Sequence, residues 1–330
     1  MESKVNDPGL SPLAAAVSSC YAALPVLPLP QPAGVEEALF PGYRVHAVPT
    51  SGATIHVLVG GSGPPLLLLH GHPETHVMWH KIAGALARRY TVVLPDLRGY
   101  GDSGKPPGGA GHANYSFRSL ARDQVAVMRH LGFDTFFLAG HDRGGRVAHR
   151  LCLDHPGAVR KACVLDIAPT LTMYRDTNQE FATRYVWWFF QIQPYPVPER
   201  LIGYDPAAYL SHHLAVQNKT DGAIDPVALR EYLRCYCCQA TIHAVCEDYR
   251  AAATLDLDHD REDEAAGRCI TAPLLVLWGA QGTVHRLWDV LSTWRAVATA
   301  VAGAALDCGH FLPEEQPKAV LAHFLHFFRD

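Results

Sequence analysis

The stretch Thr135–Arg146, TFFLAGHDRGGR, decides the fold of this chain. Its first part, Thr135–Ala139, is a short apolar run of the kind that forms a buried strand. The rest follows the pattern small-x-Asp-x-small-small and opens a helix-like segment. A sharp turn from strand to helix needs small neighbours, because the two backbones nearly touch there. We therefore predict a strand–elbow–helix unit with the Asp142 carboxylate at its tip. The alternative is an ordinary N-cap aspartate.

Similar apolar runs recur on both sides of this unit and alternate with helix-like stretches. Helices are predicted over Phe117–Leu131 and Gly144–Asp154. Strands that alternate with helices indicate an α/β fold with a mostly parallel, doubly wound sheet. Thr54–Val59, followed by a glycine-rich turn, is expected to add an antiparallel strand. The further buried parallel strands are predicted at Leu66–His70, Tyr90–Leu94, Lys161–Leu165 and Pro273–Trp278.

The strand pattern stops after Asp166 and resumes near Pro273. The segment between them is too long and too apolar for a loop, and its aromatic stretch Tyr185–Phe190 is helix-like. We expect a helical cap inserted over the carboxyl ends of the strands, where α/β sheets bind ligands. The predicted organisation is an α/β core of residues 39–167 and 269–330, a cap of residues 168–268, and a Pro- and Ala-rich N-terminal extension of residues 1–38.

The composition excludes several classes of function. The formal net charge of −4 offers no basic field, which argues against nucleic acid as a partner. No apolar run is as long as a membrane-spanning helix, so no membrane partner is expected. The nine cysteines are odd in number and suggest no disulfide framework, which favours a reducing compartment and a cytoplasmic protein. The cysteines near His243 lack repeated ligand spacing, so no metal site is predicted.

A second motif would support a nucleophilic site around Asp142. The loop His70-Gly71-His72-Pro73 directly follows a predicted strand, where hydrolases of this fold keep one oxyanion-hole N–H. The residue after the nucleophile supplies the other, so the backbones of His72 and Arg143 form the predicted oxyanion hole. A strand-end turn with a structural histidine is the alternative. A carboxylate nucleophile displaces a leaving group at saturated carbon and forms an ester.

The base and the acid of the site are predicted from their places in the chain. His310 follows the apolar run Ala304–Leu306, which suits the chain order nucleophile, acid, base. The strand that ends at Trp278 is followed by no acid until Asp289, whereas the strand before the cap ends at Asp166. We therefore predict that Asp166 orients His310. The alternative role for this aspartate is a strand-end cap.

These segments resemble the fluoroacetate dehalogenases, a branch of the α/β hydrolases, over roughly residues 39–328. The combination Asp-Arg-Gly-Gly-Arg with the acid after the strand before the cap is fairly specific to that branch. The matching stretches are HGHPETHVMWH at His70–His80, DLRGYGDSG at Asp96–Gly104, GHDRGGR at Gly140–Arg146, VLDIAPT at Val164–Thr170, CEDYR at Cys246–Arg250 and GHFLP at Gly309–Pro313.

The resemblance implies further residue roles. Arg143 and Arg146, three apart at the start of one helix, would bind the substrate carboxylate, because a guanidinium fork suits that group. Trp188 and Tyr249 match the family's halide-binding Trp and Tyr. Its halide-binding His is replaced by Trp187, which offers one N–H on a bulkier ring. Trp187 is assigned to the halide site and is expected to shift preference away from fluoride. Cap packing is the alternative for both tryptophans, and a solvated helix position for Arg146.

The expected reaction converts a 2-haloacid, such as a haloacetate, to a 2-hydroxy acid and halide through an ester on Asp142. It needs a small anionic substrate and neither a metal nor an organic cofactor. An epoxide hydrolase with the same Asp142, His310 and Asp166, and with Tyr249 protonating the epoxide oxygen, is the alternative enzyme; the arginine pair argues against it. A silent ligand receptor is a third class, disfavoured by the complete set of catalytic groups. Members of the family are often dimers, and a homodimer is left open because no interface can be read.

Overall fold

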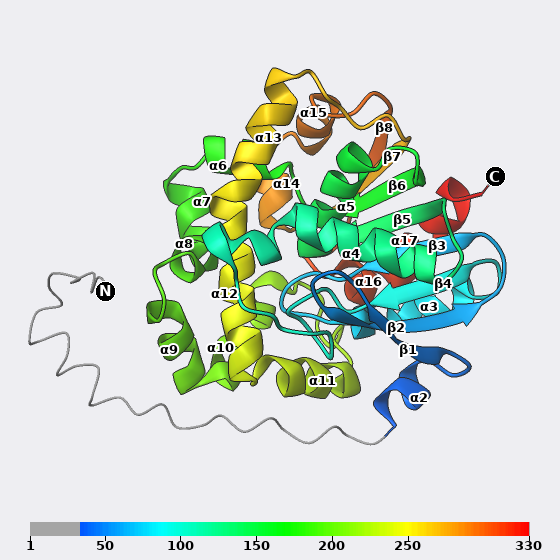
Figure 1. Cartoon of the computed structure of the whole chain (residues 1–330), viewed down its shortest axis with the longest axis horizontal. Coiled ribbons are helices and arrows are strands. Elements are labelled where there is room, and N and C mark those ends of the chain that lie inside the picture. Colours follow the sequence, from blue (N-terminus) through cyan, green and yellow to red (C-terminus); the bar gives the residue numbers. More distant parts are fainter. Residues whose placement is uncertain (1–33, 330) are drawn as a thin grey trace, which may run out of the picture.

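The computed structural model describes residues 34–329, and the predicted extension over residues 1–38 lies almost wholly outside them. The described chain folds around one eight-stranded sheet (Figure 1). The strands are β1 (Arg44–Pro49), β2 (Thr54–Gly61), β3 (Pro65–Leu69), β4 (Thr91–Pro95), β5 (Phe136–His141), β6 (Val159–Leu165), β7 (Leu274–Gly279) and β8 (Val301–Leu306).

The strand order is β1-β2-β4-β3-β5-β6-β7-β8. Strands β1, β2 and β4 pair antiparallel, and every other neighbouring pair is parallel. The predicted mostly parallel α/β sheet is confirmed. The central strands are buried along almost their whole length, as in a sheet covered on both faces, which is why they stand out in the sequence as continuous apolar runs.

Two strands are missing from the sequence-based prediction, and both lie at an edge of the sheet. β1 is mostly exposed, and β8 alternates Ala and Gly with partial exposure. β1, RVHAVP, has no continuous apolar run, and the apolar run of β8, VAGAAL, consists mostly of small residues, unlike the bulky runs of the central strands. The ends of the strands that the sequence predicts lie within two residues of the observed ends.

Helices cover the sheet and close the core. In Figure 1, α4 and α5 lie in front of the strands, and these two helices pack against each other, as do α3 and α17. The predicted helices over Phe117–Leu131 and Gly144–Asp154 correspond to α4 and α5. The helices outside the long insertion are α2 (Val35–Leu39), η1 (His76–Trp79), α3 (His80–Leu86), η2 (Ala110–Tyr115), α4 (Phe117–His130), α5 (Arg143–Asp154), α14 (Thr283–Leu287), α15 (Val290–Arg295), α16 (Leu312–Glu315) and α17 (Pro317–Phe327).

The chain between β6 and β7 is helical, which confirms the predicted insertion; its domain boundaries stay a prediction. Helices α6 to α10 and α12 gather on the left of Figure 1, beside the sheet. The longest of them, α12, packs against η2, α9 and α13 and so joins the insertion to the core. The inserted helices are α6 (Thr170–Arg175), α7 (Gln179–Arg184), α8 (Val186–Gln191), α9 (Val197–Tyr204), α10 (Pro206–Gln217), α11 (Pro226–Tyr236), α12 (Gln239–Ala253) and α13 (Leu255–Ala265).

None of the described helices combines the length and the apolar character that a membrane crossing requires. The cysteines of the described residues are free, and three in the inserted segment, Cys235, Cys237 and Cys246, are buried thiols. This agrees with the packing role of small apolar side chains that free cysteines commonly take in protein interiors.

Candidate active site

Asp142 occupies the elbow between β5 and α5. Its backbone angles, φ 45° and ψ −112°, are unusual for a residue other than glycine. A Cβ at Gly144 would lie 2.4 Å from the carbonyl oxygen of His70, so only glycine allows this close approach of helix and loop. The Asp142 side chain makes no capping hydrogen bond to the helix. Asp142 therefore has the N-cap position of α5, as the alternative expects, but its carboxylate does not cap the helix.

A histidine and a second aspartate converge on Asp142 from other loops. The His310 Nδ1 lies 2.6 Å from Asp166 Oδ2, and its Nε2 lies 3.9 Å from Asp142 Oδ2. Asp166 follows β6 with a positive φ of 51°, and its Oδ1 also accepts a hydrogen bond from the Gly279 N–H at 2.9 Å. The three predicted groups thus lie together and buried. Asp166 therefore fills both of its predicted roles: it accepts a hydrogen bond from Gly279 at the end of β7, and it contacts His310.

The loop after β3 contributes a backbone donor to the same carboxylate. The His72 N–H donates to Asp142 Oδ1 at 3.1 Å. The two carboxylate oxygens therefore have different surroundings, since Oδ1 is held by the backbone and Oδ2 faces His310. A backbone donor in this place is what an oxyanion hole requires.

The two predicted arginines are both buried, and each uses most of its donors within the protein. Arg143 Nε and Nη2 donate to Asp248 Oδ2 and Oδ1 at 2.8 and 2.6 Å, and Nη2 also reaches the Asp248 carbonyl at 2.9 Å. Arg146 Nη1 donates to Thr170 Oγ1 at 2.9 Å. Arg143 Nη1 and Arg146 Nε have no hydrogen-bond partner. The solvated alternative for Arg146 is therefore wrong.

Aromatic side chains of the insertion close the site. The Arg143 guanidinium lies 4.3 Å from the Tyr249 ring centre, and that of Arg146 lies 4.6 Å from the Trp188 ring centre. The Trp188 Nε1 is buried without a partner. The Trp187 ring packs edge-on against His213, at 4.4 Å between ring centres, and lines the pocket beside His310. The two adjacent tryptophans therefore differ, and Trp188 is the one that keeps a free buried N–H.

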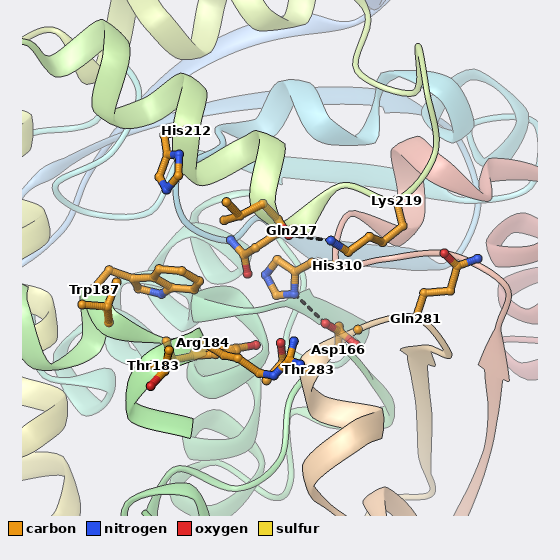
Figure 2. Close-up of a pocket in the computed structure, with 14 residues that line it drawn as sticks. Asp166, Thr183, Arg184, Trp187, His212, Gln217, Lys219, Gln281, Thr283 and His310 are labelled. Atoms are coloured by element: carbon orange, nitrogen blue, oxygen red, sulfur yellow. Dashed lines mark hydrogen bonds and ion pairs between the residues drawn. The ribbon is translucent and has the colours of Figure 1, made fainter. Parts of the chain in front are cut away.

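A pocket of about 270 Å³ leads to the His310–Asp166 pair (Figure 2). Figure 2 shows Trp187 and Gln217, from the insertion, beside His310, with Asp166 hydrogen-bonded on the other side of the imidazole. The loop after β7 forms another wall through Gln281, Gly282 and Thr283.

Comparison with known proteins agrees with this geometry. A family model described as the α/β hydrolase fold matches residues 64–317. The chain belongs to the α/β hydrolases. It is similar to a fluoroacetate dehalogenase from Burkholderia sp, with 43% identity over 294 residues that cover 88% of this chain and 96% of that protein. The predicted membership of the dehalogenase branch is therefore confirmed.

Two further similarities place this α/β hydrolase among its relatives. A soluble epoxide hydrolase from Corynebacterium sp. (strain C12) is 33% identical, over 86% of this chain and 96% of that protein. A crystal structure of an α/β hydrolase from Nostoc sp is 54% identical, covers 86% of this chain and 97% of its own, and has a TM-score of 0.85.

In the site of this α/β hydrolase, the pKa of Asp142 and the pKa of His310 are shifted in opposite directions. Burial alone would raise the pKa of the Asp142 carboxyl, but His310 and Arg146 oppose it and the pKa lies below its ordinary value. Burial alone would lower the pKa of His310, but the hydrogen bond and charge of Asp166, together with the charge of Asp142, raise it above 6.5. Asp142 is therefore ionised near neutral pH, and the protonation of His310 depends on the charge that Asp142 carries.

The structure also reveals residues that sequence reasoning missed. Asp248 pairs with Arg143, and the Tyr100 hydroxyl donates to the same Asp248 carboxylate at 2.6 Å. His213 is buried between Trp187 and His72. A signal was available for one of them, because Asp248 directly precedes Tyr249 in a segment that resembles the family. His213 stands among the many histidines of this chain with no motif around it.

Within the described residues, two groups of side chains bring potential metal ligands together, and neither includes Asp142, His310 or Asp166. They are Glu36, His56 and His76, and Glu199, His243 and Glu247. In the second group, Arg250 Nη1 lies 2.6 Å from Glu199 and 2.8 Å from Glu247, so the negative charges of both glutamates are already paired with an arginine.

Proposed function

We propose that this α/β hydrolase converts a 2-haloacid anion to a 2-hydroxy acid and halide through an aspartyl ester on Asp142. The observation that carries the proposal is the arrangement of Asp142 with two buried arginines whose donors Arg143 Nη1 and Arg146 Nε lack partners. A buried donor without a partner costs free energy unless a ligand supplies the acceptor. A substrate carboxylate would satisfy both, which an epoxide cannot do.

In the proposed first step, the haloacid carboxylate binds Arg143 and Arg146, and Asp142 Oδ2 attacks the halogen-bearing carbon. The new C–O bond forms as the carbon–halogen bond breaks, and the halide leaves with the electron pair. Oδ1 stays with the His72 N–H. The nucleophile is ionised at neutral pH because the pKa of the Asp142 carboxyl is lowered.

The second step hydrolyses the ester. His310 Nε2 takes a proton from a water molecule, and the oxygen of that water attacks the Asp142 carbonyl carbon. The negative charge that develops on Oδ1 is stabilised by the N–H groups of His72 and Arg143. Asp166 Oδ2, at 2.6 Å from His310 Nδ1, fixes the tautomer and stabilises the imidazolium. Collapse of the intermediate breaks the bond between the Asp142 carbonyl carbon and the ester oxygen. That oxygen takes the proton from His310 and leaves as the hydroxyl of the 2-hydroxy acid, and Asp142 returns to the carboxylate as its own proton passes to solvent.

The departing halide is proposed to leave toward Trp188 and Tyr249. Trp188 has a buried N–H without a partner, which is a donor ready for an anion. The pKa of Tyr249 is raised well above its ordinary value, chiefly by burial, so its hydroxyl stays protonated and can donate. Trp187 is the third proposed member of this halide site, although its ring packs against His213.

The test of this function is to trap the ester. His310→Asn should leave alkylation of Asp142 intact but stall hydrolysis, so incubation with bromoacetate should give an adduct on the peptide that contains Asp142, detected by mass spectrometry. The matched control is the His310→Asn, Asp142→Asn double variant, which should carry no adduct on that peptide. If the adduct of His310→Asn appeared only on other peptides, the mechanism would be excluded.

Epoxide hydrolysis is the second candidate, and one feature of the site favours it. Tyr185 and Tyr249 both lie close enough to Asp142 for its charge to raise the pKa of each hydroxyl, in addition to burial. Two protonated hydroxyls near the nucleophile could donate to an epoxide oxygen. The similarity to a soluble epoxide hydrolase supports the same candidate. Parallel assays with styrene oxide and chloroacetate distinguish the two reactions, and turnover of styrene oxide alone would make epoxide hydrolysis the better proposal.

A further inference from the structure

Glu315, the last residue of α16, has a buried carboxylate that accepts four hydrogen bonds. Its Oε1 accepts from the Phe311 N–H at 2.8 Å. Its Oε2 accepts from the Gly309 and Lys219 N–H groups at 2.8 and 2.9 Å, and from the Thr220 hydroxyl at 3.1 Å. Both oxygens of this carboxylate, an acceptor-only group, are therefore engaged by donors of the protein.

The four donors come from two segments that are far apart in the sequence. Gly309 and Phe311 are the residues on either side of His310. Lys219 and Thr220 belong to the chain that leaves α10 in the inserted helices. One carboxylate therefore joins the loop of the proposed base to the cap, because its Oε2 receives donors from both.

A second contact between the same segments reinforces this junction. The His310 N–H donates to the Gln217 carbonyl at 3.1 Å. A Cβ at Gly309 would lie 2.2 Å from that carbonyl, so only glycine lets the cap approach the loop so closely. The three consecutive amides from 309 to 311 thus all donate to Glu315 or to the end of α10.

The junction also reaches the pocket. Gln217 and Lys219 line the pocket beside His310 (Figure 2), and the Gln217 side-chain amide lies 2.7 Å from His213 Nε2. A displacement at the end of α10 would consequently move both a wall of the pocket and the backbone that carries the imidazole.

We propose that Glu315 is a positioning residue that locks the end of α10 to the His310 loop, so that the cap and the base are seated together. The effect of Glu315 on catalysis rests on the proposed function, and we expect it only in the hydrolysis of the ester. Attack by Asp142 needs no base, whereas hydrolysis of the ester needs His310 Nε2 aligned with a water molecule. Misplacing that group by about 1 Å is enough to slow a step by roughly 100-fold.

The experiment compares Glu315→Gln with wild type and with Glu262→Gln, an exposed glutamate on α13 that serves as the matched control. A glutamine offers one acceptor oxygen, and its NH₂ would face backbone donors. Rapid-quench measurement with bromoacetate should show an alkylation rate like that of wild type and ester hydrolysis slowed roughly 10- to 100-fold. The control should leave both rates unchanged. Equal slowing of both steps would overturn the positioning role.

Hydrogen–deuterium exchange provides a readout that needs no turnover. In Glu315→Gln, amide protection should fall together in residues 217–220 and 309–311 and stay unchanged in the central strands. Loss in only one of these segments would overturn the junction. If wild type releases no halide from any haloacetate, the proposed function fails, and the exchange result still decides the role of Glu315.

A milder variant keeps the test decisive if Glu315→Gln does not fold. Thr220→Val removes one donor on the cap side and leaves the carboxylate in place. The expected result is a smaller loss of protection that still extends to residues 309–311. A loss confined to residues 218–221 would contradict the coupling, because the two segments would then move independently.

Discussion

Arg143 and Asp248 form a buried, two-pronged ion pair, with Arg143 Nε and Nη2 at 2.8 and 2.6 Å from the two oxygens of Asp248. Both side chains are inaccessible to solvent. The pair leaves one guanidinium nitrogen of Arg143 for a ligand, and it fixes the plane in which that nitrogen points. Asp248 thus offsets part of the free-energy cost of burying the Arg143 charge, although it contacts no atom of the proposed substrate.

Removing the Asp248 charge should destabilise the fold. Asp248→Asn leaves the buried Arg143 charge without its counter-ion, a change that typically costs about 3–5 kcal/mol in the free energy of unfolding. Urea unfolding measures it. The matched control is Asp258→Asn, which breaks an exposed pair with Arg261 and should cost roughly 0–1 kcal/mol. Similar losses in both variants would mean that the buried pair is not needed.

Arg146 should discriminate between an acid and its amide. Arg146→Lys replaces a fork with a point charge, so a charge-assisted hydrogen bond worth about 1.5–3 kcal/mol is lost or misaligned. We expect kcat/KM for chloroacetate to fall accordingly, while activity on chloroacetamide, which we expect to be low in wild type, changes little. If wild type hydrolysed chloroacetamide as well as chloroacetate, carboxylate recognition by Arg143 and Arg146 would be wrong.

The titration of His310 should follow the charge of Asp142. The pKa of His310 is raised above 6.5, with Asp166 and Asp142 as the groups that favour the imidazolium. The base is therefore lost as pH falls through that raised pKa. In Asp142→Asn, which has no charge at this position, as in the ester, the pKa should be lower. NMR titration of the imidazole compares the two proteins, and a pKa that is unchanged or higher in the variant would contradict the coupling.

The same argument predicts different pH profiles for the two chemical steps. Alkylation uses only ionised Asp142, whose pKa is lowered, so its rate should stay constant as His310 protonates. Ester hydrolysis should decline on the acid side with the pKa of His310 in the esterified enzyme. Rapid-quench rates over a pH series test this, and parallel acid limbs for both steps would refute it.

Trp187 should move the leaving-group preference away from fluoride. Fluoride is small and strongly solvated, so its departure needs close donors, and the Trp187 ring is packed against His213. We expect kcat/KM to be higher for chloroacetate or bromoacetate than for fluoroacetate. Trp187→His should raise the fluoride-to-chloride ratio, whereas Trp188→Phe, which removes the buried free N–H, should slow all three substrates. A wild-type preference for fluoroacetate would rule out the shift.

The parts of this molecule that depend on local pattern can be predicted from its sequence. Central strands are continuous apolar runs, and the Asp142 elbow has small residues where two backbones touch, so both are recognisable in the amino-acid sequence alone. His310 and Asp166 can be predicted because the order of strands limits where loops meet. The ion pair of Asp248 with Arg143 and the hydrogen bonds of Glu315 to Gly309 and Phe311 cannot, since both carboxylates meet their partners only when distant segments pack together. The edge strands escape prediction because the exposed β1 mixes polar with apolar residues and β8 has mostly small ones.

The position of Asp166 has a consequence for altering this enzyme by design. Because the proposed acid, Asp166, follows β6, the loop after β7 carries none of the three proposed catalytic residues, yet Gln281 and Thr283 line the pocket. This part of the pocket lining and the proposed catalytic residues therefore lie in separate stretches of the sequence. Libraries confined to residues 281 and 283 would vary the lining of the pocket and leave Asp142, His310 and Asp166 unchanged, which makes this loop the place to begin if the proposed range of acid substrates is to be broadened.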